Sequence, residues 1–161
     1  MSSQYTDETT IASITTSATE RTAMGDPRSD RASTACTLRN QPEAAKQARS
    51  FARGHMVAWG AEESVIYDAT VIVTELVSNA ILHSGADRIS VRLSYSSPEL
   101  SIYIADTGSW RHRCQQTGGC DQAESGRGLN LIAAIARQSG VRRTVNGTCA
   151  WATLLMSGPG P

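Results

Sequence analysis

The sequence lacks an excess of either charge, a long apolar run and a secretory start, and each absence removes a class of function. Lysine plus arginine and aspartate plus glutamate both number 15, so the formal net charge is zero. Nucleic-acid binders usually carry a basic excess or stripe, so this balance argues against direct nucleic-acid binding. No uninterrupted apolar run approaches the roughly 20 residues that cross a bilayer, and no basic start precedes an apolar block. We therefore expect a cytoplasmic protein that does not bind membranes.

Internal repeats, a GxxxxGK[ST] phosphate loop and paired C-x2-C motifs are also missing. Four cysteines are present (Cys36, Cys114, Cys120 and Cys149), and in a cytoplasmic chain we expect them to stay reduced. The spacing of His112, Cys114 and Cys120 hints at a metal site. Convincing zinc sites have more closely paired ligands, so free thiols in a loop are the favoured interpretation.

The length of 161 residues suits one domain with a core of its own. Residues 1–33 are rich in Ser, Thr, Asp, Glu and Arg without a hydrophobic period, which predicts a disordered tail. The folded domain is expected over residues 34–156, followed by a flexible C-terminus over 157–161.

Hydrophobic periodicity predicts eight elements within that domain. A short strand near residues 33–41 should turn Ala35, Thr37 and Leu38 inward. The others are helices at 42–60, 63–83 and 126–140, strands at 87–95, 99–106, 141–145 and 148–156, a long loop at 109–125, and an Asn146-Gly147 hairpin turn. This order predicts an α+β fold, a two-layer sandwich with helices on one face of a largely antiparallel mixed sheet.

A polar stripe interrupts the apolar second helix. Glu75, Asn79 and His83 stand four residues apart, so their side chains rise along one edge of the helix. Taken alone, the spacing fits an ordinary helix border facing solvent. An acid and an amide in line could also orient a hydroxyl and hold a magnesium ion.

Two further motifs follow in the sequence. Asp106-Thr107-Gly108 ends an apolar strand, where a carboxylate could accept a hydrogen bond from an exocyclic amine and a glycine could let a planar ligand approach. Gly126-Arg127-Gly128 opens the third predicted helix, where free amides could receive phosphate. Each motif alone is common, but together they predict a nucleoside triphosphate site.

The three motifs "ELVSNAILHS", "DTG" and "GRGLNLI" resemble the N, G1 and G2 boxes of the ATPase fold shared by gyrase, the heat-shock chaperone, histidine kinases and mismatch-repair proteins. Within that superfamily, the chain resembles the stand-alone anti-sigma-factor serine/threonine kinases of bacteria, particularly their actinobacterial relatives. The likeness spans roughly residues 34–156. It includes "PEAAKQARSFARGHMVAWG" and "GTCAWATLLM" at its two ends.

The resemblance implies a role for each motif residue, with ATP and Mg²⁺ as cofactors. Glu75 would be the catalytic acid, Asn79 the magnesium ligand and Asp106 the reader of the adenine amine. Gly108 would shape the base pocket, while Gly126 and Gly128 would border the triphosphate. Arg127 would contact phosphate or a partner, and His83 would line the nucleotide or pack behind it.

The implied function is a protein kinase that phosphorylates a small antagonist protein and sequesters an alternative sigma factor, and the resemblance to the related kinases also implies a homodimer. The chain departs from the wider pattern at Ser109-Trp110, where a further glycine is absent, and in having GRG in place of three alternating glycines. The main alternative is an ATP-binding regulator that inhibits by contact alone. A detached histidine-kinase catalytic domain and a redox sensor built on the Cys/His loop at 112–120 are weaker alternatives.

Overall fold

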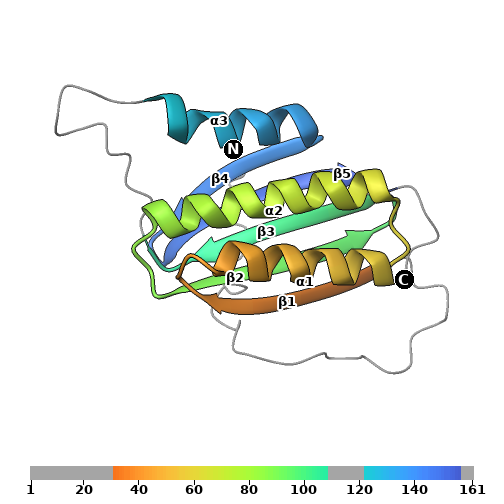
Figure 1. Cartoon of the computed structure of the whole chain (residues 1–161), viewed down its shortest axis with the longest axis horizontal. Helices are drawn as coiled ribbons and strands as arrows, with labels where there is room; N and C mark the ends of the chain where they lie inside the picture. The colour runs from red at the N-terminus through yellow and green to blue at the C-terminus, as the bar shows by residue number, and fades with distance from the viewer. Residues whose placement is uncertain (1–30, 109–121, 157–161) are drawn as a thin grey trace, which may run out of the picture.

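The computed structural model describes residues 31–108 and 122–156 (Figure 1). The tail over residues 1–33 lies almost wholly outside this range, as does the C-terminus over 157–161, so the predicted domain limits stay predictions. In chain order the elements are β1 (Arg31–Arg39), α1 (Ala44–Ala58), α2 (Glu63–His83), β2 (Arg88–Ser96), β3 (Glu99–Asp106), α3 (Gln122–Ile135), β4 (Gln138–Thr144) and β5 (Gly147–Leu155).

The strands form one sheet in the order β1-β2-β3-β5-β4, and every pairing between the described strands is antiparallel. All three helices lie on the same face of this sheet (Figure 1). The predicted two-layer α+β sandwich is therefore confirmed. The expectation of a mixed sheet is wrong for the described residues: all four strand pairings are antiparallel, and β2–β3 and β4–β5 are hairpins.

Alternation of apolar and polar residues explains which face of the sheet is buried. The three central strands direct their apolar residues toward the helices: Ile89, Val91, Leu93, Tyr95, Leu100, Ile102, Ile104, Ala150, Ala152 and Leu154. Each large aliphatic side chain buried in this way contributes roughly 1.5–3 kcal/mol. The core between sheet and helices thus fixes the register of all three strands.

The edge strand β1 corrects one prediction. Ala35 is exposed, whereas Ala32, Cys36 and Leu38 pack against the core. The predicted inward positions mixed the two faces, because the small and hydroxylated residues of "STACTLR" do not alternate clearly between apolar and polar. Pairing with β2, in which Cys36 lies opposite Val91, decides the phase instead.

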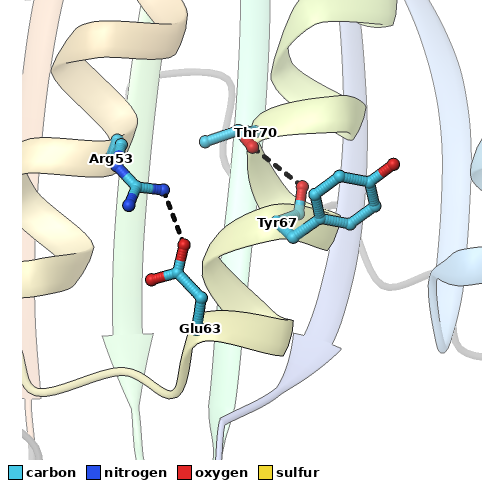
Figure 2. Close-up of polar contacts among 4 residues, drawn as sticks. All are labelled: Arg53, Glu63, Tyr67 and Thr70. Atoms are coloured by element: carbon cyan, nitrogen blue, oxygen red, sulfur yellow. Dashed lines mark hydrogen bonds and ion pairs between the residues drawn. The ribbon is translucent and has the colours of Figure 1, made fainter.

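Helix α1 packs through small residues, with Ala44, Ala48 and Ala52 completely buried at intervals of four. Its C-terminus leads into Gly60, whose φ of 71° is the left-handed conformation that ends many helices. One exposed ion pair, between Arg53 and Glu63 at 3.0 Å, joins α1 to the start of α2 (Figure 2). This helix confirms the prediction for residues 42–60, apart from two residues at each end.

Helix α2 spans Glu63–His83, as the sequence predicts, and forms the centre of the helical layer. Within its first turns the Thr70 hydroxyl donates to the carbonyl of Tyr67 at 2.8 Å (Figure 2). The helix is long and apolar enough, by length and composition alone, to span a bilayer. Its apolar residues are instead used in the core, where Ile72, Val73 and Leu76 are buried.

Helix α3 and the closing hairpin differ from the predicted limits. The helix begins at Gln122 rather than Gly126, and ends at Ile135 rather than near Gly140. Upstream, Gln-Ala-Glu supplies strong helix formers, which extend the helix before the glycines. Downstream, Gln138–Gly140 pair with β5, so the residues beyond Ile135 satisfy their backbone in the sheet. The hairpin itself is confirmed, but its turn is Val145-Asn146, one residue before the predicted Asn146-Gly147, because Gly147 already pairs with Thr144.

Candidate functional site

The polar stripe of α2 lies between fully buried positions. Glu75, Asn79 and His83 are each half-buried, while Leu76 and Ala80 beside them are fully covered. Their spacing of four residues places them along one line, as predicted. The apolar side of α2 is packed against the core, and this packing fixes the direction in which the stripe faces.

Helix α3 meets this stripe at Gly128, which is buried. A Cβ added at Gly128 would lie 2.5 Å from Oε2 of Glu75 and 3.8 Å from Nδ2 of Asn79. The absence of a side chain at this position therefore gives the Glu75 carboxylate its room. The structure brings the first and third motifs together, and it gives Gly128 a role beside the acid.

The side-chain amide of Asn79 is placed as a binding group for a ligand would be. Its Nδ2 atom is completely buried and has no hydrogen-bond partner within the described residues. Burying an amide without a partner is unfavourable, typically by about 1–3 kcal/mol. A half-turn of the amide exchanges its nitrogen and oxygen, so the same site can present a carbonyl oxygen. An oxygen donor beside the Glu75 carboxylate fits a hard cation such as magnesium.

The Asp106 turn lies where β3 ends, and it is held rigidly. Asp106 is only 7% exposed, and its Oδ1 accepts a hydrogen bond of 2.8 Å from the amide of Gly108. The Thr148 hydroxyl donates to the carbonyl of Gly108 at 3.2 Å. A buried, oriented carboxylate at the end of this central strand agrees with the predicted role in accepting a hydrogen bond from an amine.

Two glycines allow backbone segments to meet closely around this turn. A Cβ at Gly108 would lie only 1.8 Å from the carbonyl oxygen of Ser84, the residue that follows α2. A Cβ at Gly147, whose φ is 143°, would lie 1.9 Å from the carbonyl oxygen of Asp106. The sequence resemblance implies that Gly108 shapes a base pocket. The structure adds that the lack of a side chain at Gly108 lets the Asp106 turn pack against the residue that follows α2.

The third motif does not open its helix as predicted, while the expectation that Gly126 and Gly128 border the triphosphate stays a prediction. Only the first few amides of a helix lack partners within that helix. Because α3 begins at Gln122, Gly126 and Gly128 lie in its second turn, and their amides belong to the helical ladder rather than to a free N-terminus. The side chain of Arg127 lies outside the described part, as do Ser109, Trp110 and the Cys/His loop at 112–120.

Sequence reasoning missed Thr148 and Asn40. Thr148 is 3% exposed and stands directly opposite Asp106 in the β3–β5 register. Asn40 follows β1 and bonds to the segment after α2, donating to the carbonyl of Ala86 at 2.7 Å. No local motif marks either residue, because strand pairing between distant segments brings them to the site.

The described thiols are kept protonated. Cys36 and Cys149 are free cysteines. Burial raises the pKa of Cys36 from 9.0 to about 11. Burial also raises the pKa of Cys149, which the Arg142 guanidinium opposes and the Asp106 carboxylate reinforces. No cluster of three or more His, Cys, Asp or Glu side chains occurs in the stretches 31–108 and 122–156, so any cation there would need ligands from a bound molecule or water.

A separate cavity of about 160 Å³ lies beside α3, away from the Asp106 turn. Its lining is mostly apolar and comprises Leu76, Leu129, Ile132, Ser139, Gly140, Val141 and Trp151. None of the stripe residues lines it. The cavity therefore does not supply the polar groups that a nucleotide would need.

Comparisons with known proteins agree with this geometry. Residues 38–154 match the family described as "Histidine kinase-like ATPase domain", a description that implies ATP binding. Among curated proteins, no sequence matches. The crystal structure of the RsbU and RsbW domains of Rv1364c from Mycobacterium tuberculosis is similar in fold, with a TM-score of 0.64 and 24% identity. That match covers 80% of this chain and 33% of the other, so the present chain corresponds to about a third of its length. Since the family match spans most of the sequence, the chain belongs to the histidine kinase-like ATPase domain family.

Proposed function

We propose that the protein is an ATP-dependent serine/threonine protein kinase that regulates transcription as an anti-sigma factor. The observation that carries this proposal is that other segments of the chain meet the second half of α2 at two glycines: Gly128 lies against Glu75 near the middle of the helix, and Gly108 lies against Ser84, which follows its last residue. Nine residues separate Glu75 from Ser84, which corresponds to about 13 Å of helix. An extended nucleotide can lie along that length.

The base would bind at the Asp106 turn. The carboxylate is oriented by the Gly108 amide and buried at the end of β3, which suits it to accept a hydrogen bond from the adenine amino group. His83 lies on the same side of α2 as Asn79, and would line the nucleotide or support its neighbours from behind. The buried environment strengthens hydrogen bonds to the base.

The phosphates would extend toward Asn79 and Glu75. The Asn79 amide oxygen would hold Mg²⁺, which, when bound, neutralises charge on the phosphate oxygens. Glu75 would accept the proton of a serine or threonine hydroxyl as that oxygen bonds to the γ-phosphorus and the bond to the ADP leaving group breaks. Gly128 leaves space for the carboxylate in this role.

The protein substrate would be a small antagonist, whose phosphorylation leaves the kinase free to sequester an alternative sigma factor in the cytoplasm. The sequence resemblance to anti-sigma-factor kinases supports these partners, and the structural likeness to a chain containing an RsbW domain agrees with it. A homodimer is part of the same proposal. Light scattering on the purified protein tests the dimer directly.

Thermal unfolding with ATP, with and without Mg²⁺, tests the nucleotide site. Ligand at about 100 times its dissociation constant should stabilise the wild type by roughly 2.7 kcal/mol. Asp106→Asn should lose most of this stabilisation, and Asn79→Ala should lose its dependence on Mg²⁺. A well-folded wild type without any shift at millimolar ATP would refute the proposal.

One observation favours a second candidate, a regulator that binds ATP without transferring phosphate. Gly126 and Gly128 are engaged within α3, so their amides do not form a free phosphate cradle in this structure. Glu75→Ala separates the candidates. A kinase loses phosphorylation of its partner but keeps partner binding, whereas a contact inhibitor shows no phosphorylation in either form and equal inhibition.

A further inference from the structure

Asn40 joins two parts of the fold that border the proposed base site. The residue lies directly after β1, and its amide hydrogen donates to the carbonyl of Asp87 at 2.9 Å. Its Nδ2 donates to the carbonyl of Ala86 at 2.7 Å and to the hydroxyl of Ser84 at 3.5 Å. Because Ala86 presents a carbonyl at the short distance, the side-chain orientation of Asn40 is fixed by its partner.

The segment that Asn40 holds is the turn between α2 and β2. Ser84 is 5% exposed, and its hydroxyl also accepts a hydrogen bond of 3.2 Å from the amide of Ala86. The Ser84 hydroxyl and the Ala86 carbonyl therefore both accept hydrogen bonds from the side-chain amide of Asn40. Without it, the nearly buried carbonyl of Ala86 would lose its side-chain donor, and the turn could shift.

This turn supports the Asp106 turn by direct backbone contact. The carbonyl of Ser84 lies so close to Gly108 that no side chain fits between them. Gly108 in turn donates its amide hydrogen to Oδ1 of Asp106. A continuous series of contacts thus runs from the Asn40 side chain through Ser84 and Gly108 to the Asp106 carboxylate.

We propose that Asn40 is a positioning residue that sets the selectivity of the site for adenine, through Ser84 and Gly108. This inference rests on the proposed ATP-binding function. Hydrogen bonds weaken steeply when their distance and angle are disturbed, so a small displacement of the Asp106 turn weakens recognition of the base amine. Binding of the phosphates near Asn79 and Glu75, five and nine residues before Ser84, is not affected by that displacement.

The experiment compares ATP with inosine triphosphate, which carries an oxygen where ATP has the amino group. Dissociation constants are measured by calorimetry for the full-length wild type, Asn40→Ala and the neighbouring control Gln41→Ala, whose side chain is exposed. Asn40→Ala should weaken ATP binding about tenfold, as expected when one hydrogen bond is lost, and leave the inosine nucleotide unchanged. Gln41→Ala should retain the wild-type ratio of the two affinities.

Ser84→Ala removes the same connection at its other end and provides a second variant if Asn40→Ala does not fold. Like Asn40→Ala, it should lower the affinity for ATP relative to the affinity for inosine triphosphate. If folded Asn40→Ala or Ser84→Ala kept the wild-type ratio of ATP affinity to inosine triphosphate affinity, whether both affinities stayed the same or fell equally, the positioning role would be overturned. The proposed function would remain intact. A wild type that binds neither nucleotide would refute the proposed function, and the inference with it.

Discussion

Replacing Gly128 by alanine should separate stability from activity. In the interior of a helix, alanine is favoured over glycine by about 1 kcal/mol. The added Cβ would meet Oε2 of Glu75 at 2.5 Å, which is the mobile end of a side chain rather than backbone. The carboxylate can retreat by about 0.9 Å to reach the 3.4 Å of ordinary contact, at a rotamer cost of about 1 kcal/mol. The two terms nearly cancel, so the unfolding free energy should stay within about 1 kcal/mol of wild type.

Activity should respond differently. A displacement of about 1 Å in a catalytic group can lower a rate by about 100-fold. We therefore expect Gly128→Ala to lose about that factor in ATP turnover or partner phosphorylation while its ATP affinity remains close to wild type. Chemical denaturation, calorimetry and a phosphate-release assay measure the three quantities.

Gly54→Ala is the matched control. Gly54 also lies inside a helix, α1, and a Cβ there would have no neighbour within 4 Å. This variant should gain the same helical preference and keep full activity. If Gly128→Ala retained wild-type turnover, or unfolded several degrees earlier than wild type, the argument that this glycine serves Glu75 would be wrong.

Three further predictions test other parts of the structure. Gly108→Ala should destabilise the protein by roughly 3 kcal/mol in urea unfolding, because its Cβ would meet the fixed carbonyl of Ser84; wild-type stability would contradict this packing. At pH 8, alkylation of Cys36 should be about 100-fold slower in the folded than in the unfolded protein, because raising its pKa from 9.0 to about 11 lowers the thiolate fraction; equal rates in peptide mass spectrometry would refute this. Glu63→Gln should change the unfolding free energy by less than about 1 kcal/mol, since the ion pair of Glu63 with Arg53 is exposed to solvent. A larger loss of stability would contradict the expectation that an exposed ion pair contributes little.

Strongly periodic segments were predictable from sequence. Helix α2 and strands β2 and β3 have clear apolar periods, and the structure confirms them nearly residue for residue. Errors fell where the local pattern was ambiguous. The pattern predicts that Ala35 faces inward, whereas it is exposed, and it predicts that α3 begins at Gly126, whereas the helix begins four residues earlier at Gln122.

The sequence by itself determined the α+β class, which follows from the order of the elements, and it determined the stripe of Glu75 and Asn79 on α2 and the carboxylate of Asp106 at a strand end, because these depend on spacing along one element. Only the tertiary structure decided that Gly128 lies against Glu75, that Thr148 stands opposite Asp106, and that Asn40 supports the Asp106 turn through Ser84. These contacts join segments far apart in the chain. They arise from strand register and helix packing, which bury a common core and leave no local pattern in the residues that they bring together.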